Sequence, residues 1–260
     1  GLLLIFMVTY GIINGAFKEA LSFLFKPDFS MVTSNTFLVA MGQAFFSLSL
    51  GMGSIMAYGA YMSKDQNIVS TSYSVGALDT LVAIMAGLAV FPIIFSIQGL
   101  EPSGGPGLVF ISLQSAFNQM DFGNIIGPIF FILLSVAALS SSISILEPGV
   151  AYLSEEGYLS RTKSAIIISL ICWLIGIGTA LGFDKEGNNT FQANIELIST
   201  NIMQPLGGML IAIFIGWFMK ESLIKDELGN INQDVYTLWR VFIKFVAPIG
   251  VGCVLISQLF

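Results

Sequence analysis

The chain has 260 residues, of which 55% are hydrophobic and only 10% charged, and it carries a net charge of −6 without any histidine. A soluble domain carries about a quarter of its residues as charged side chains, so this composition excludes an ordinary soluble protein. The acidic balance also excludes a nucleic-acid-binding protein, which needs basic surface. The composition therefore predicts an all-α integral membrane protein, with the lipid bilayer as its solvent.

Apolar runs mark the expected membrane spans, because a spanning helix needs roughly 20 mostly apolar residues. The chain begins inside such a run, without an initiator methionine or a signal-peptide pattern, so we expect a fragment cut within a membrane helix. In chain order, the sequence predicts one partial span at residues 2–16 and complete spans at residues 37–62, 75–95, 125–153, 164–183, 197–219 and 238–260.

Basic residues orient these spans, since cytoplasmic loops are enriched in lysine and arginine. Seven of the ten basic residues fall in alternating loops, namely Lys64, Arg161, Lys163, Lys220, Lys225, Arg240 and Lys244. The opposite loops hold only Lys18, Lys26 and Lys185. We expect a multi-pass protein of the inner (plasma) membrane with its C-terminus on the outer side.

Weak helix formers gather in the middle of the span at residues 37–62. They are Ser47, Ser49, Gly51 and Gly53. Each glycine costs a helix about 1 kcal/mol relative to alanine, so the helix can break here and offer its amides and carbonyls to a ligand. Small residues also permit close helix packing, and spacing alone leaves this alternative open.

Asp79 is the only charged residue of the span at residues 75–95. A buried carboxylate must be paired, protonated or close to a cation. The spans contain no basic residue near this depth, so the sequence favours an ion or a hydroxyl cluster as its neighbour. A solvated aspartate at a helix end is the alternative.

The longest outer loop, residues 96–124, is more apolar than a flexible linker. A glycine- and proline-rich stretch from Glu101 to Gly107 precedes an apolar run and then Phe117 and Met120. We expect this loop to fold back onto the protein as a short hairpin. The alternative is a loop that rests on the membrane surface.

One stripe of the span at residues 125–153 carries Ala137, Ser140, Ser141 and Ile145, which are spaced for one helical face. Hydroxyl and carbonyl oxygens are suitable sodium ligands, although serine hydroxyls can instead bond to carbonyls of their own helix. Glu196, at the start of another expected span, indicates little alone because helix N-termini favour acidic residues.

Catalytic chemistry is not expected. An intramembrane hydrolase would need a base beside its serine nucleophile. The chain has no histidine, and no span offers a suitable lysine. We therefore expect a protein that is not an enzyme.

Four segments, in the right order, resemble the neurotransmitter:sodium symporter family. Residues 42–51 (GQAFFSLSLG) resemble its sixth helix and residues 61–65 the following cytoplasmic loop. Residues 101–110 are similar to its extracellular plug loop, and residues 139–148 to its eighth helix. The resemblance implies helices five to eleven of an eleven-helix bacterial member, with the inverted-repeat transporter fold of the bacterial leucine transporter type.

The resemblance also implies binding residues. The sodium ligands would be Ser47, Asp79, Ala137, Ser140 and Ser141. The substrate side chain would contact Phe46, Ser47, Ser49, Met52, Ser141 and Ile145. The outer gate or vestibule would include Gln43, Phe46 and Glu196.

The implied function is secondary active symport of sodium with an amino acid by alternating access, without a cofactor other than sodium. Met52 stands where some members carry phenylalanine, which predicts a bulky aliphatic or aromatic substrate. Asp79 replaces the family's usual asparagine, and Ala83 replaces the serine of chloride-dependent members, so we expect no chloride requirement. The alternative is a non-transporting membrane fragment or scaffold, because the first helices are missing. The sequence leaves the oligomeric state open.

Overall fold

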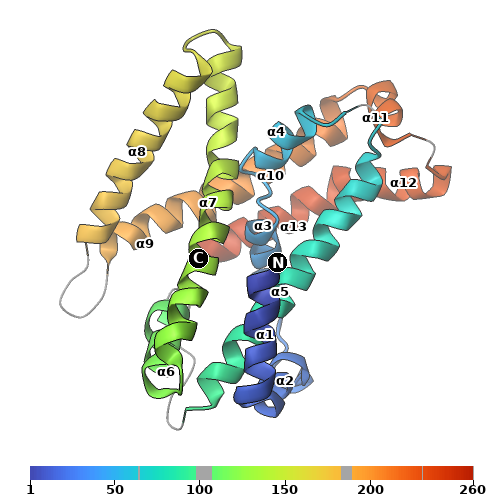
Figure 1. Ribbon diagram of the computed structural model, residues 1–260. Coiled ribbons are helices and arrows are strands. Elements are labelled where there is room, and N and C mark those ends of the chain that lie inside the picture. The colour runs from blue at the N-terminus through green and yellow to red at the C-terminus, as the bar shows by residue number, and fades with distance from the viewer. Residues whose placement is uncertain (64, 98–106, 183–188, 230, 260) are drawn as a thin grey trace. The chain divides into compact units, whose positions relative to one another are not determined.

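The computed structural model describes the chain except for residues 64, 98–106, 183–188, 230 and 260 (Figure 1). The described residues form helices and turns without a strand, which confirms the all-α prediction. Five helices are long and apolar enough to cross a membrane: Ile68–Phe95, Gly123–Glu155, Arg161–Leu181, Thr190–Phe218 and Gln233–Ile256. A bent pair near the N-terminus would provide a sixth span.

The helices form two compact units. Unit 1 holds residues Gly1–Val32 and Ser74–Ser141, and unit 2 holds residues Thr33–Tyr73 and Ser142–Phe260. Two of the three boundaries fall inside long helices, and the first lies between η1 and α3. Unit 1 contains α1 (Leu2–Asn14), α2 (Phe17–Phe25), η1 (Phe29–Met31), most of α5 (Ile68–Phe95), η2 (Leu108–Ser112), α6 (Leu113–Gln119) and the first part of α7 (Gly123–Glu155).

The first expected span ends in a sharp bend. The helix axis turns by 114° between α1 and α2, so α2 occupies residues that the sequence placed in a loop. The bend packs on α5, where a Cβ atom at Gly15 would lie 2.7 Å from the backbone carbon of Pro92. The Ala16 amide donates a hydrogen bond of 2.8 Å to the carbonyl of the same proline. Glycine is therefore required at this turn.

The second half of the loop at residues 96–124 folds back into unit 1 as a short helix, where the sequence predicted a hairpin. Leu113, Ala116 and Phe117 are buried in the unit 1 core. The Phe117 ring packs against Phe130 of α7, with 5.8 Å between ring centroids. Glu101 and the glycine-rich stretch that follows it to residue 106 lie outside the described residues.

Unit 2 is built around a broken helix. Its elements are α3 (Ser34–Ser47), α4 (Ser54–Ala60), α8 (Arg161–Leu181), α9 (Thr190–Glu196), η3 (Leu197–Met203), α10 (Gln204–Ile213), η4 (Phe214–Phe218), α11 (Glu221–Leu228), α12 (Gln233–Val241), η5 (Phe242–Val246) and α13 (Ala247–Leu259), with the first part of α5 and the last part of α7. Within this unit α10 contacts both α3 and α13. The expected span at residues 37–62 is interrupted, so neither α3 nor α4 alone is long enough to cross a bilayer.

Polar caps start two helices about two turns before their apolar runs. The Asn67 side chain accepts a hydrogen bond of 2.9 Å from the Ser70 amide, and α5 begins at Ile68 rather than at residue 75. The Asn189 side chain likewise accepts a hydrogen bond of 2.9 Å from the Gln192 amide, and α9 begins at Thr190, whereas the expected span begins at residue 197. Glu196 therefore lies inside a helix and not at its start, which corrects the sequence expectation.

Candidate functional site

The helix break has a defined hydrogen-bond geometry. After α3 ends at Ser47, the Leu50 amide donates to the Phe45 carbonyl (2.9 Å) and the Ser49 amide donates to the Phe46 carbonyl (3.1 Å). This pair of bonds is a Schellman motif, which closes a helix with one residue in the left-handed region. That residue is Ser49, with a φ of 52°. A glycine would adopt this conformation with less strain, so the break carries a local free-energy cost.

Two glycines continue the break to the start of α4. Gly51 has a φ of 82° and Gly53 a φ of 84°, and helical structure resumes at Ser54. A Cβ atom at Gly51 would overlap the Gln204 carbonyl oxygen and lie 2.7 Å from the Gly208 amide nitrogen. The helix break and the close helix packing, which were alternatives in the sequence, are therefore both present: the helix breaks here, and Gly51 permits close packing on α10.

Gln204 of α10 forms a hydrogen bond to the end of α3, next to the break. Its Nε2 atom donates a hydrogen bond of 2.8 Å to the Phe45 carbonyl, which already accepts from Leu50. The residue is 3% exposed, and its Oε1 atom is buried without a hydrogen-bond partner among the described residues. Sequence reasoning missed this residue, because a glutamine in an apolar span does not reveal which helix it faces.

Most predicted substrate and gate residues of unit 2 are close together because they are close in sequence. Gln43, Phe46 and Ser47 share one face of α3 at spacings of three and four residues. Ser49 and Met52 follow within the break, and both are half-buried. The local backbone thus presents hydroxyl, carbonyl and apolar groups within one short segment.

The predicted stripe of α7 is continuous in the helix Gly123–Glu155, and its side chains are exposed in the described chain. The Ser140 hydroxyl donates a hydrogen bond of 2.8 Å to the Ala137 carbonyl. A hydroxyl that donates its proton keeps its lone pairs as acceptors. The bond of a serine to its own helix, which was the alternative reading, is thus present and leaves the oxygen able to bind a cation.

Asp79 lies in the interior of α5 and is half-buried within unit 1. Glu196, the predicted acidic gate residue, is the last residue of α9 and is exposed.

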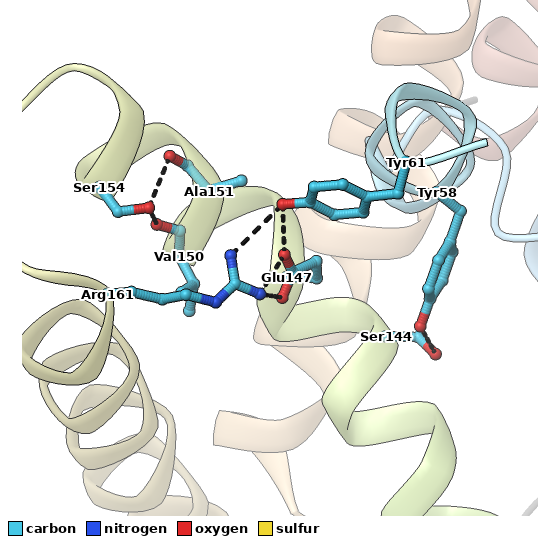
Figure 2. A network of polar contacts seen from close by, with 8 residues as sticks. All are labelled: Tyr58, Tyr61, Ser144, Glu147, Val150, Ala151, Ser154 and Arg161. Atoms are coloured by element: carbon cyan, nitrogen blue, oxygen red, sulfur yellow. Dashed lines mark hydrogen bonds and ion pairs between the residues drawn. The ribbon is translucent and has the colours of Figure 1, made fainter. Parts of the chain in front are cut away.

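A second polar group, at one end of α4, was not predicted. Figure 2 shows Tyr61, Glu147 and Arg161 pointing toward one another from the end of α4, from α7 and from the start of α8. The Tyr61 hydroxyl donates a hydrogen bond of 2.8 Å to the Glu147 carboxylate. Arg161 donates hydrogen bonds of 2.7 and 2.9 Å to the two oxygens of the same carboxylate. Arg161 also donates 3.3 Å to the Tyr61 oxygen. This network ties three helices of unit 2 by charge-assisted hydrogen bonds.

The same region contains a further link between α4 and α7. The Tyr58 hydroxyl donates 2.8 Å to the Ser144 hydroxyl oxygen (Figure 2). A signal for the network was present in the sequence, since Glu147 is the only charged residue of the span at residues 125–153. The rule that selected Asp79 selects Glu147 equally well.

The whole chain resembles known membrane transporters. The model of the sodium:neurotransmitter symporter family matches residues 2–260. An uncharacterized sodium-dependent transporter of Haemophilus influenzae is 36% identical over 270 residues, which cover 100% of this chain and 58% of the relative. The sodium-dependent transporter YhdH of Bacillus subtilis is 31% identical and covers 94% of this chain and 56% of the relative.

A solved structure has the same fold. The crystal structure of MhsT in complex with L-phenylalanine superposes with a TM-score of 0.84 and 43% sequence identity, covering 99% of this chain and 60% of MhsT. The chain thus spans somewhat more than half the length of each of these three relatives.

Proposed function

We propose that this chain, which belongs to the sodium:neurotransmitter symporter family, contributes to a secondary active transporter that moves sodium together with an amino acid by alternating access. The observation that carries the proposal is the break in unit 2. Between Ser47 and Ser54 the backbone leaves the helical ladder and is held by a Schellman motif and by α10. Non-helical backbone at membrane depth is tolerated where it lines a covered cavity or a binding site.

Sodium is the proposed coupling ion, and the relatives' names support it, because both are sodium-dependent transporters. The proposed ligands are Ser47, Asp79, Ala137, Ser140 and Ser141, whose hydroxyl, carbonyl and carboxylate oxygens suit a hard cation. Bound sodium favours one conformational state of the transporter only if the sodium affinity differs between the two states. A substrate that binds the favoured state more tightly then binds with higher affinity when sodium is present.

The proposed substrate is a bulky aliphatic or aromatic amino acid, bound by Phe46, Ser47, Ser49, Met52, Ser141 and Ile145. Gln43, Phe46 and Glu196 are proposed for the outer gate or vestibule. Two observations support the substrate class. Met52 is a flexible apolar residue inside the break, and the related MhsT was crystallised with L-phenylalanine. The proposed location is the inner (plasma) membrane, with the C-terminus on the outer side.

Uptake by the full-length protein in proteoliposomes tests this function. We expect an inward sodium gradient to drive uptake of labelled L-leucine or L-phenylalanine, and potassium not to replace sodium. Unlabelled bulky amino acids should compete, because an apolar pocket gains free energy from each buried methylene. Competition by glycine or lysine alone would contradict the substrate class. Sodium-independent binding, or none, by a folded protein would favour a non-transporting membrane scaffold.

Asp79→Asn tests whether the carboxylate takes the place of chloride. We expect the variant to need chloride, so that its uptake in chloride-free medium falls roughly tenfold, which corresponds to about 1.4 kcal/mol. The physical reason is that removing one fixed negative charge leaves the bound cation less neutralised in a medium of low dielectric constant. Uptake would be measured with gluconate in place of chloride, with Asp226→Asn on exposed α11 as the control. Unchanged, chloride-independent uptake by Asp79→Asn contradicts the role.

A further inference from the structure

We propose that Gln204 is a positioning residue that sets the geometry of the helix break and thereby the sodium affinity of the site. This inference rests on the proposed function, because it assumes that the break binds the coupling ion. The residue itself is not proposed to touch sodium or substrate. It acts through the Phe45 carbonyl, which directly precedes Phe46 and Ser47 in the chain.

One face of α10 is shaped to receive the break. Gln204, Gly207 and Gly208 are separated by three and four residues and therefore share a helical face. A Cβ atom at Gly207 would lie 2.5 Å from the Gly51 carbonyl oxygen, and one at Gly208 would lie 2.5 Å from the Phe45 ring. The two glycines bring the backbones together, and the glutamine adds the directional bond between them.

The backbone at Gln204 is itself irregular. The residue follows the π-helical turn Leu197–Met203 and precedes Pro205, which has no N–H to donate. Such π turns are rare and are frequent at functional sites. They shift the register of the residues that follow, so the turn aligns this face of α10 with the break.

Stability alone does not explain a glutamine at this position. A typical hydrogen bond stabilises a fold by only about 1 kcal/mol, whereas a buried oxygen without a partner costs about 1–3 kcal/mol. Gln204 makes one bond to Phe45 and buries its Oε1 atom without a partner among the described residues. An apolar side chain of similar size would avoid this cost. The net gain from glutamine therefore lies in geometry rather than in folding free energy.

The Phe45 carbonyl is the point at which this geometry acts. It is the acceptor that closes the Schellman motif with Leu50, so its direction fixes where the chain leaves α3. The next two residues supply a pocket residue and a proposed sodium ligand. Without the Gln204 amide, this carbonyl keeps one hydrogen bond and the break samples more orientations, which weakens any site that needs one of them.

The test compares Gln204→Met, which keeps the size and removes the donor, with Gln204→Glu, which donates only when protonated. The control is Gln233→Met, the same change at an exposed glutamine of α12. Sodium-dependent binding of labelled L-leucine and thermal stability would be measured in the full-length transporter. We expect Gln204→Met to raise the sodium concentration for half-maximal binding about fivefold, without lowering the melting temperature. The sodium requirement of Gln204→Glu should fall toward that of the unmodified protein as pH is lowered.

An unchanged sodium requirement in Gln204→Met overturns the inference. If that variant does not fold, the pH dependence of the sodium requirement of Gln204→Glu tests the inference, and a sodium requirement that does not change with pH overturns the inference. The comparison requires that the sodium requirement of the unmodified protein does not change over the same pH range. Absence of sodium-dependent binding in the unmodified transporter would instead overturn the proposed function, and this inference with it.

Discussion

Replacing Gly51 by alanine in the full-length transporter is expected to abolish sodium-dependent uptake and to lower thermal stability. Two effects act together at this position. The φ of 82° lies in the left-handed region, which costs an alanine about 1 kcal/mol or more. The added methyl group would also overlap the Gln204 carbonyl oxygen and lie 2.7 Å from the Gly208 amide nitrogen. Both obstacles are backbone atoms, which cannot move aside as a flexible side chain can.

The overlap must be relieved by moving α10 away from the break or by changing the break itself. Overpacking of this kind typically costs about 1–3 kcal/mol in addition to the strain. Either movement also separates Gln204 from the Phe45 carbonyl, so the position of the break changes even if the protein still folds. Uptake into proteoliposomes and the melting temperature of the purified protein would both be measured.

Gly59→Ala is the matched control, because it lies in α4 of the same broken span. A Cβ atom there meets nothing within 4 Å, and the glycine has ordinary helical geometry. Alanine in a helix interior is favoured over glycine by roughly 0.5–1 kcal/mol, so this variant should keep its uptake and be slightly more stable. Normal uptake by Gly51→Ala would show that the close packing on α10 does not matter for transport.

The break could be predicted from sequence because its cause is local. Ser49, Gly51 and Gly53 are poor helix formers in consecutive alternate positions, and they are the residues with positive φ in this segment. Its partner could not be predicted in the same way. Gln204 lies 159 positions from Phe45 in the chain, and the contact depends on which face of which helix packs there. Composition carries no information about that choice.

Two helices extend beyond the expected apolar spans where polar caps lie outside the apolar run. Asn67 and Asn189 start their helices before the apolar residues begin, and a hydropathy window does not register them. An asparagine before a helical segment is a recognised N-cap signal, so these starts were accessible to a reading that weighed caps. The bend after α1 is different. It depends on the fit of Gly15 to Pro92 of another helix.

Glu147, like Asp79, is the only charged residue of an expected apolar span. A lone charge in an apolar span marks a functional or paired residue by default. That rule selected Asp79, and it applies equally to Glu147. The sequence could have supplied the partner as well, since Arg161 lies only 14 positions further along, at the start of the next helix. The hydrogen bond from Tyr61 to Glu147 could not be predicted in this way, because the two residues are 86 positions apart and meet only in the folded chain.

Arg161→Gln is expected to lower uptake roughly thirtyfold, because it removes two charge-assisted hydrogen bonds from a sheltered carboxylate. The Glu147 side chain is only 14% exposed, whereas that of Arg161 is 59% exposed. Removing the arginine therefore leaves a mostly buried negative charge with the Tyr61 hydroxyl, while removing the glutamate leaves an arginine that water can solvate. A buried charge that loses its partner destabilises more than the loss of the whole pair.

This asymmetry predicts a rescue. The double variant Glu147→Gln with Arg161→Gln should recover much of the uptake lost by Arg161→Gln alone, because the uncompensated charge is gone. The result would identify the network as a tie between α4, α7 and α8 rather than as a set of independent contacts. Uptake equal to or lower than that of Arg161→Gln would contradict the prediction, since the arginine would then act through something other than Glu147.

Lys225→Gln is the matched control for charge removal. Its 2.8 Å pair with Glu221 in α11 is comparably short, and the hydrogen bond from Lys225 lowers the pKa of the Glu221 carboxyl, so the pair is charged at neutral pH. Both side chains are nonetheless about half exposed, at 47% and 58%. Exposed pairs contribute little because water solvates either partner alone, so uptake should change less than about twofold. The contrast between these two pairs of similar length tests whether shelter from solvent, rather than the presence of an ion pair, gives the Glu147–Arg161 contact its effect.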